Sequence, residues 1–273
     1  MLKQGWIFVT TLLLSQWGWA HEDPLVILTH PEPPFVYTND KGELDGYAVQ
    51  LVQGIQQQTS SHAPILLHPW ARVYLRASTE ANLMVFSMVR NAEREARFHW
   101  ITPITRNPHA LFAKNGVIKR LDKLSDLAVL PAVGVQRGDF REQLLIEAGL
   151  ENIVSYTTWE QAVGALLKDR VNALFFSGAG ISYFCMQLKE DCSDIVNVYQ
   201  HQVETTYLAM SMDSPISQVR EWQEAAARYK ESPAFKYLAE QWLTRYRKDF
   251  GFTLQLQDNT LYFAQFREAS QWR

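Results

Sequence analysis

Short apolar segments alternate along the chain with segments in which apolar residues recur at helical spacing. The segment LVILTH at 25–30 predicts a strand that ends at PEPP, because proline removes an amide donor and fixes φ. Between Ala48 and Ile55 apolar residues recur at i, i+3, i+4 and i+7, which predicts an amphipathic helix. The chain thus begins with a strand, a loop and a helix.

The same alternation continues, and it predicts an α/β protein with a parallel sheet and a second α/β unit beyond about residue 128. The last stretch, TLQLQDNTLYFAQF, alternates apolar and polar residues on either side of Asp258 and Asn259, which predicts a hairpin. The further predicted strands are PILLH, ANLMVFSM, AVLPAVGVQ and VNALFFS, and the further predicted helices begin at Pro69, Phe140, Trp159, Val219 and Pro233.

Residues 1–20 have the pattern of a secretory signal peptide. Lys3 precedes an apolar run from Trp6 to Leu14, and the segment ends on Gly18, Trp19 and Ala20, with small residues at −3 and −1 of a cleavage point. The run is shorter than the roughly 20 residues that span a bilayer. We expect a cleaved leader and a mature, exported protein that starts at His21, with a retained anchor as the alternative.

The composition narrows the function classes. Hydrophobic residues make up 47% of the 273 residues, so the chain can bury a large core. The formal charge is −3, and the loss of Lys3 with the leader makes it one unit more negative. This mild acidity without a long basic run argues against nucleic acid as a partner.

Two cysteines occur, in CMQLKEDC at 185–192. In an exported protein, Cys185 and Cys192 most simply form a local disulfide. A metal pair is the alternative, but the seven histidines are scattered and none stands in an HxxxH or HExxH spacing. We expect neither a metal nor a cofactor.

Several segments together carry a resemblance to a known family. PPFVYTNDKGELDGYAVQLVQGI, the ANLMVFSMVRNAERE segment with the WITPI that follows, VGVQRGDF, WEQAVGALLKDRVNALFF and YKESPAFKYLAEQWL stand in the order typical of family 3 periplasmic solute-binding proteins. The resemblance covers about residues 25 to 245. The Pro-Trp-x-Arg element at 69–72 resembles a subgroup whose ligands are poorly defined.

The resemblance implies a two-lobe, type II periplasmic-binding-protein fold with the ligand in the cleft between the lobes. Residues 21–109 and 206–273 would form a discontinuous lobe one, and 110–205 would form lobe two. The chain would cross between them near HALFAKN and VETTYLAMS. Hinge closure would then trap the ligand.

The resemblance also assigns a role to Arg94 in SMVRNAEREARFHW: a bidentate pair with the carboxylate of the ligand. From the residues alone, Arg94 could instead pair with Glu93 or Glu95 on a solvated helix. We expect Arg97 on the surface and leave the direction of Arg90 open.

Two departures from the family pattern put an ordinary α-amino acid in doubt. Val89 replaces the usual small polar residue five positions before Arg94, although Ser87 could still contact a carboxylate. Ser177 stands where an aspartate usually neutralises an ammonium group, and a hydroxyl cannot do so in a desolvated cleft.

The other candidate ligand-binding residues each keep a structural alternative. Glu32 could pair a cationic group or be a solvated loop acid, and Trp70 with Arg72 could face the cleft or, for Trp70, pack inside its lobe. The resemblance points to the side chain of Gln136, two positions before Gly138. Three aromatic residues could form apolar walls of the cleft or could instead be ordinary core residues: Phe35, Tyr37 and Phe176.

The leading hypothesis is a non-enzymatic, monomeric receptor that delivers a small polar or carboxylate-bearing solute to the membrane permease of an ABC importer. No hydrolase signature such as GxSxG occurs. One alternative is a dehydratase-like enzyme on the same fold, with Glu32, Arg94 and Arg72 acting on a carboxylate. Another is a ligand sensor that docks on a membrane receptor.

Overall fold

The computed structural model describes residues 24–251 and 253–263, so the predicted leader and the predicted start at His21 lie outside the described residues. The strands are β1 (Val26–Thr29), β2 (Tyr37–Thr38), β3 (Leu44–Asp45), β4 (Ile65–Leu67), β5 (Leu83–Val89), β6 (Phe98–Lys114), β7 (Val133–Gln136), β8 (Ile153–Tyr156), β9 (Ala173–Phe176), β10 (Ile195–Ser211), β11 (Leu254–Gln257) and β12 (Thr260–Phe263). Each predicted strand is present, although AVLPAVGVQ is a strand only from Val133 to Gln136, and β2, β3 and β8 were not predicted. Two strands, β6 and β10, are much longer than expected.

Six of the seven α-helices in the described residues begin within a few residues of their predicted starts, and the helix that begins at Gly178 was not predicted. Most N-terminal caps are sequence-encoded, since the side chains of Asp139, Thr158, Ser177 and Ser232 each accept a backbone N–H bond at a helix start. The helices are α1 (Tyr47–Gln56), α2 (Trp70–Thr79), α3 (Phe140–Glu147), α4 (Trp159–Leu167), α5 (Gly178–Leu188), α6 (Ile216–Glu231) and α7 (Pro233–Asp249), with short 3₁₀ turns η1 (Glu95–Arg97) and η2 (Leu124–Val129).

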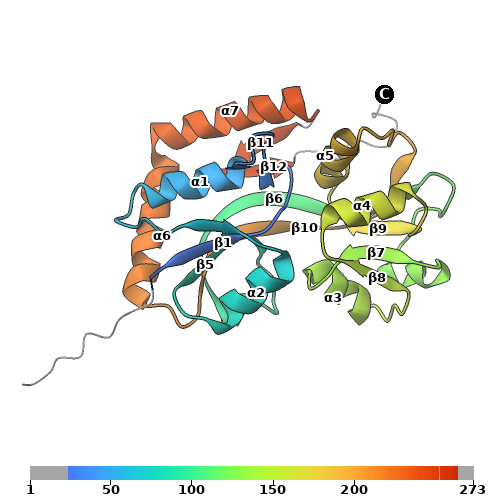
Figure 1. Cartoon of the computed structure of the whole chain (residues 1–273), viewed down its shortest axis with the longest axis horizontal. Coiled ribbons are helices and arrows are strands. Elements are labelled where there is room, and N and C mark those ends of the chain that lie inside the picture. Colours follow the sequence, from blue (N-terminus) through green and yellow to red (C-terminus); the bar gives the residue numbers. More distant parts are fainter. Residues whose placement is uncertain (1–23, 252, 264–273) are drawn as a thin grey trace, which may run out of the picture.

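One mixed sheet runs through the molecule in the order β4-β1-β5-β10-β6-β9-β7-β8. At one end β1 pairs in parallel with β4 and β5, and at the other β7 pairs in parallel with β8 and β9. Helices α1, α2, α6 and α7 gather around the first end and α3, α4 and α5 around the second (Figure 1). The two α/β units predicted from the sequence are therefore both present.

The strands β6 and β10 join the two ends of the sheet. They are antiparallel to each other over most of their 17 residues, and their pairing shifts register at four places. The predicted crossings, HALFAKN and VETTYLAMS, lie inside these strands rather than in loops. The sequence did not reveal this continuity, because Pro103 and Pro108 interrupt β6 and proline usually marks a strand end.

Apolar faces on both sides of this sheet form the core. Leu51, Val52 and Ile55 of α1 are fully buried, as their spacing predicted. Gly54 of α1 lies against the ring of Tyr229 of α6, where a Cβ atom would come within 2.1 Å of the ring, so only glycine allows this approach. Burial of such side chains contributes roughly 1.5–3 kcal/mol each.

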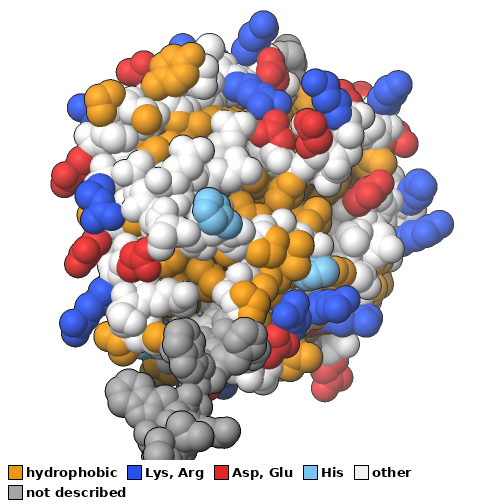
Figure 2. All heavy atoms as spheres, turned by 60° about the vertical axis from the view of Figure 1, so that its left-hand side comes forward, with side chains coloured by type: hydrophobic (Ala, Val, Ile, Leu, Met, Phe, Trp, Pro, Cys, Tyr) orange, Lys and Arg blue, Asp and Glu red, His pale blue; other side chains and the backbone are white. Residues whose placement is uncertain are grey.

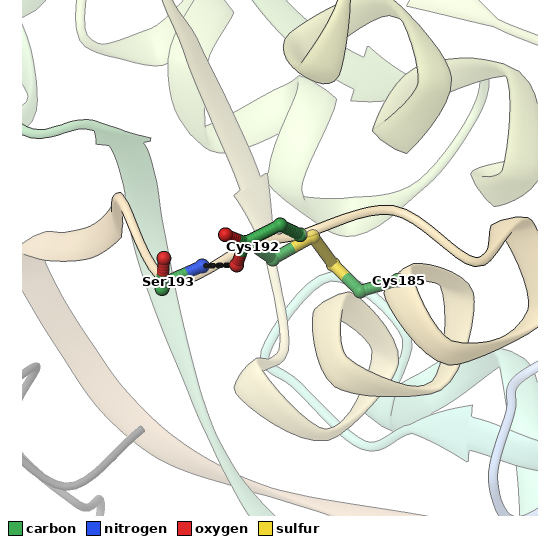
Figure 3. The surroundings of a disulfide bond; sticks show 4 residues. Cys185, Cys192 and Ser193 are labelled. Carbon is green, nitrogen blue, oxygen red and sulfur yellow. Dashed lines mark hydrogen bonds between the residues drawn. A yellow bond between two sulfur atoms is a disulfide. The ribbon is translucent and has the colours of Figure 1, made fainter. Parts of the chain in front are cut away.

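Two local predictions are confirmed. Strands β11 and β12 form the predicted hairpin, with Asp258 and Asn259 in the left-handed region at the turn. A disulfide joins Cys185 in α5 to Cys192 (Figure 3).

The surface carries both charge signs. On the face in Figure 2, Lys and Arg side chains alternate with Asp and Glu around the periphery, and hydrophobic side chains are visible between them. Across residues 24–251 and 253–263, no helix combines the length and the apolar character needed to cross a bilayer.

Candidate ligand-binding site

A small, partly open cavity lies where the two ends of the sheet face each other. Its volume is about 10 Å³, which is the space of about one water molecule. The lining comes from the first end of the sheet, from the second end, and from the long strands that join them. The lining residues are His30, Glu32, Trp70, Ser87, Val89, Arg94, His109, Asp139, Phe140, Arg141 and Thr206.

An irregular segment of β5 forms one wall of the cavity. Between Val85 and Met88 the strand has one more residue than the partner segment of β10, so β5 bulges there. Ser87, at the bulge, has φ 62°, a left-handed conformation that is unfavourable for a residue with a Cβ. The bulge turns the Ser87 carbonyl toward His30, whose Nε2 lies 3.3 Å from it.

Arg94 is buried, with 3% of its surface exposed. Its guanidinium lies over the rings of Trp70, at 5.0 Å, and Tyr74, at 4.8 Å. Its Nη1 donates to the Val89 carbonyl at 3.3 Å, whereas its Nε has no partner among the described residues. Arg94 is therefore a desolvated cation with a spare donor in a cavity wall.

The alternative interpretation of Arg94 as a solvated helix residue is wrong. Glu95 pairs with Arg90, with a shortest distance of 2.5 Å, and Glu93 lies 3.9 Å from Arg97. Arg97 is exposed, as predicted. Arg90 lies over the rings of Trp100 and Tyr207 and is not among the residues that line the cavity.

Arg141, at the start of α3, supplies a second buried guanidinium. It lines the cavity from the end of the sheet opposite to that of Arg94. Asp139 caps α3 and binds Arg141 through both carboxylate oxygens: Nε donates to Oδ1 at 2.6 Å, and Nη2 donates to Oδ2 at 3.0 Å. Burial alone would raise the pKa of Asp139, but the Arg141 guanidinium holds it below its ordinary value. Asp139 is thus ionised and fully engaged.

Glu32 connects the two ends of the sheet. Its Oε2 accepts a bond from Trp159 Nε1 at 3.2 Å, and its Oε1 lies 3.9 Å from Nη2 of Arg141. Burial raises the pKa of Glu32 to about 7, although Arg141 opposes the shift. The alternative of a solvated loop acid is wrong, since Glu32 is 6% exposed.

Trp70 makes a second connection across the cavity. Its Nε1 donates to the Gly138 carbonyl at 2.6 Å, and its ring lies 4.8 Å from that of His30. Gly138 has φ 72°, and a Cβ added there would touch Ala71 at 3.5 Å. The ring of Trp70 therefore both packs within its own end of the sheet and contacts the other end.

Two histidines complete the cavity as neutral groups. Burial lowers the pKa of His30 to about 4, with the bond to the Ser87 carbonyl opposing it. Burial, followed by the nearby Arg141 charge, lowers the pKa of His109 well below its ordinary value. His30 Nδ1 and His109 Nε2 have no partner among the described residues. Each offers a free hydrogen-bonding atom near neutral pH.

Of the residues predicted from sequence, Glu32, Trp70, Ser87 and Arg94 meet at the cavity, and Gln136, Ser177 and Arg72 do not line it. Gln136 is buried and donates to the Thr157 carbonyl at 3.3 Å. Ser177 caps α5 by accepting a bond from Gly180 N.

The remaining predicted residues lie away from the cavity lining. Arg72 is exposed on α2. Among the predicted walls, Phe35 packs on Tyr246 and Tyr37 on Tyr183. Phe176 stacks on Trp159, with ring centroids 3.9 Å apart, and so supports the cavity from behind. For Phe35 and Tyr37 the core-packing alternative describes the geometry.

Sequence reasoning missed His30, His109, Asp139, Phe140, Arg141 and Thr206 as lining residues. A signal was available for three of them, because Asp139, Phe140 and Arg141 directly follow Gly138 in the loop that the resemblance indicated. The histidines gave no such signal, since their positions on β6 and after β1 become neighbours only in the folded sheet. Among the described residues no group of three or more His, Cys, Asp or Glu could hold a metal ion.

A family model, described as bacterial extracellular solute-binding proteins, family 3, matches residues 25–245. An arginine-binding periplasmic protein of Mannheimia haemolytica is 22% identical over 167 residues, which cover 60% of this chain and 67% of that protein. The matched region includes both ends of the sheet and every residue that lines the cavity.

Solved structures show the same fold at low identity. A histidine kinase sensor domain with similarity to periplasmic binding proteins superposes with a TM-score of 0.71 at 16% identity, covering 80% of this chain and 96% of that one. An ancestral arginine-binding protein bound to arginine gives 0.68 at 19% identity and covers 81% and 99%. A mutant of ArgBP from T. maritima gives 0.69 at 16% identity and covers 81% and 95%. The predicted two-lobe periplasmic-binding-protein fold is confirmed.

Proposed function

The chain belongs to the family 3 bacterial extracellular solute-binding proteins, and from this premise we propose that it captures a small carboxylate-bearing solute between two lobes and presents it to the permease of an ABC importer. The lobes would be 21–109 with 206–273, and 110–205. Cleavage after residue 20 would release the protein to the periplasm, where it would act as a monomer. It would not transform its ligand.

The observation that carries the proposal is Nε of Arg94, which lies in the cavity wall and has no partner among the described residues. A desolvated guanidinium is costly unless an anion pairs with it, so the site is completed by a ligand carboxylate. The two stacked rings of Trp70 and Tyr74 hold the guanidinium plane in place, which reduces the entropy lost on binding.

The contacts across the cavity support trapping by closure. Trp70 to Gly138 and Glu32 to Trp159 join the two ends of the sheet, and β6 and β10 are the continuous connections between them. Because about 10 Å³ holds little more than a water molecule, these contacts would have to open before the cavity could hold a solute. The register shifts in β6 and β10 interrupt regular pairing and are suitable positions for a hinge.

A thermal-shift screen of the chain from His21 onward tests the proposal. The library contains amino acids, polyamines, small organic acids and aromatic carboxylates, and each hit is recovered and checked by mass spectrometry. A ligand at hundredfold excess over its Kd stabilises the native state by about 2.7 kcal/mol. A carboxylate that raises Tm and is recovered unchanged supports the proposal. A hit that is converted to a product, or a library without a carboxylate hit, contradicts it.

A further inference from the structure

The cavity contains a cation that the chain itself supplies. Arg141 has 2% of its side chain exposed, and its guanidinium carbon lies 4.4 Å from the ring centre of Trp159 and 5.0 Å from that of Phe140. The carboxylate of Asp139 accepts hydrogen bonds from Nε and Nη2 of Arg141. Flat rings on the faces and a carboxylate at the edge are the surroundings that a ligand guanidinium would need.

The carboxylates of the cavity lining are already engaged with this internal cation. Asp139 uses both of its oxygens on Arg141, and Glu32 accepts the Trp159 bond and lies within 3.9 Å of Arg141. Glu204, close enough to interact electrostatically with Arg141, accepts a bond from Gln202 and does not line the cavity. Both lining carboxylates therefore already interact with Arg141, and an ammonium or guanidinium group of a ligand would have to compete with it for them.

The donors that remain unpaired suit an anion instead. Nη1 of Arg141 can only donate, so Nδ1 of His109, 3.2 Å away, accepts, and the proton of the neutral ring is on Nε2. That Nε2–H and the Nε–H of Arg94 have no partner among the described residues. Conversely, His30 donates from Nε2 to the Ser87 carbonyl, which leaves its Nδ1 as an acceptor for a hydroxyl.

We propose that Arg141 is a resident cation that occupies the place of a ligand's cationic side chain, so that the site excludes guanidinium-bearing solutes and accepts small carboxylates with a neutral remainder, bound through Arg94 and His109. This inference deepens the proposed function and rests on it for the identity of the site. Arginine, named in several relatives, would then be rejected here.

The exclusion has a physical cause. The guanidinium of a ligand would have to displace Arg141 from Asp139. If it did not, two positive charges would lie side by side in one desolvated site, which is costly. Arg141→Ala removes the competitor and leaves Asp139, Glu32 and the rings of Trp159 and Phe140 around an empty space. That space should accept the guanidinium of a soluble molecule.

The test compares the wild type with Arg141→Ala by thermal shift and calorimetry, with L-arginine, methylguanidine and methylammonium as probes. Arg137→Ala is the matched control, because Arg137 is an exposed arginine in the same loop. We expect Arg141→Ala to bind methylguanidine or L-arginine at least about tenfold more tightly than the wild type and Arg137→Ala do. Methylammonium, which lacks the planar fork, should show no such gain.

Three outcomes decide the inference. Wild-type binding of L-arginine as tight as that of Arg141→Ala overturns it. If Arg141→Ala is unfolded alone, a cooperative melting transition restored by methylguanidine but not by methylammonium supports it, and no restoration overturns it. In the double variant Asp139→Asn/Arg141→Ala, the gain in affinity for methylguanidine should be smaller, because the carboxylate at the edge of the site is lost. An equal gain would show that the guanidinium binds elsewhere and would overturn the inference.

The proposed function fails separately. A wild type that binds no carboxylate of the screening library, nor acetate, propionate or lactate, contradicts carboxylate capture even when Arg141→Ala gains guanidinium binding. In that case the position of Arg141 as a resident cation stands. If wild type instead binds lactate but not L-arginine, both the proposed function and the inference are supported.

Discussion

The segments that follow β5 and β7 each bring a buried arginine to the same cavity, but the two arginines have different partners. In the loop after β5, Arg94 lies over Trp70 and Tyr74 but has a single side-chain bond, to the Val89 carbonyl. After β7, in the first turn of α3, Arg141 also lies over aromatic rings, yet it pairs with Asp139 and donates to His109. Both arginines lie over aromatic rings, but only Arg141 is hydrogen-bonded to a carboxylate among the described residues.

The difference separates a structural charge from an available one. Arg141 and Asp139 neutralise each other within two residues of the same helix start, so they leave little charge for a ligand. Nε of Arg94 has no partner among the described residues, so this donor is available to the ligand carboxylate proposed above. Burial of an arginine alone therefore does not identify a binding residue; its unused donors do.

Asp139→Asn should have the largest effect of these variants on stability. Asparagine can still cap α3, so the substitution removes mainly the charge that pairs with buried Arg141. We expect the free energy of unfolding to fall by about 3–5 kcal/mol, measured by urea denaturation. Asp126→Asn, which alters a carboxylate that accepts backbone N–H bonds near solvent, should cost about 1 kcal/mol. Equal losses of unfolding free energy in the two variants would show that Asp139 does not owe its effect to its pairing with Arg141.

Arg94→Ala should abolish measurable binding of the carboxylate that the screen identifies. The expected loss is about 2–5 kcal/mol of binding free energy, because the ligand carboxylate would be buried without its charged partner. Isothermal titration calorimetry measures it. Arg97→Ala, an exposed arginine three residues away, should bind like the wild type. Unchanged affinity in Arg94→Ala would mean that its free donor does not serve the ligand.

Glu32→Gln should change how the free energy of unfolding depends on pH, which tests how strongly Arg141 pairs with Glu32. The pKa of Glu32 is raised from 4.5 to about 7, so between these values the native state binds more protons than the unfolded state. The wild type thus loses stability relative to Glu32→Gln as the pH rises through this window. His30 and His109, whose lowered pKa values act in the opposite direction, are common to both proteins and cancel in the difference.

The expected gain of Glu32→Gln over the wild type, between about pH 4.5 and about pH 7, is on the order of 1–3 kcal/mol. Urea denaturation of both proteins at several pH values measures it. A difference in unfolding free energy that stays constant across the window, or falls as the pH rises, would contradict the expectation. It would show that Arg141 stabilises the Glu32 carboxylate fully, as it does that of Asp139.

Much of the fold was predictable because local signals agreed with the final packing. The spacing of apolar residues located α1, the turn residues Asp258 and Asn259 located the last hairpin, and the two cysteines located the disulfide. The continuity of β6 was not predictable, since proline inside a strand is rare and local rules end the strand there.

Within the cavity, the sequence by itself determined that Arg94, Glu32, Trp70 and Ser87 were candidates, because a resemblance carries residue types in a fixed order. Only the tertiary structure decided that Arg141 belongs beside them. Its carboxylate partner Asp139 is local, but its contacts with Glu32, His109 and Trp159 come from residues distant in the chain. Side-chain charges acquire their roles from such neighbours, and neighbours across a sheet are set by packing rather than by spacing along the chain.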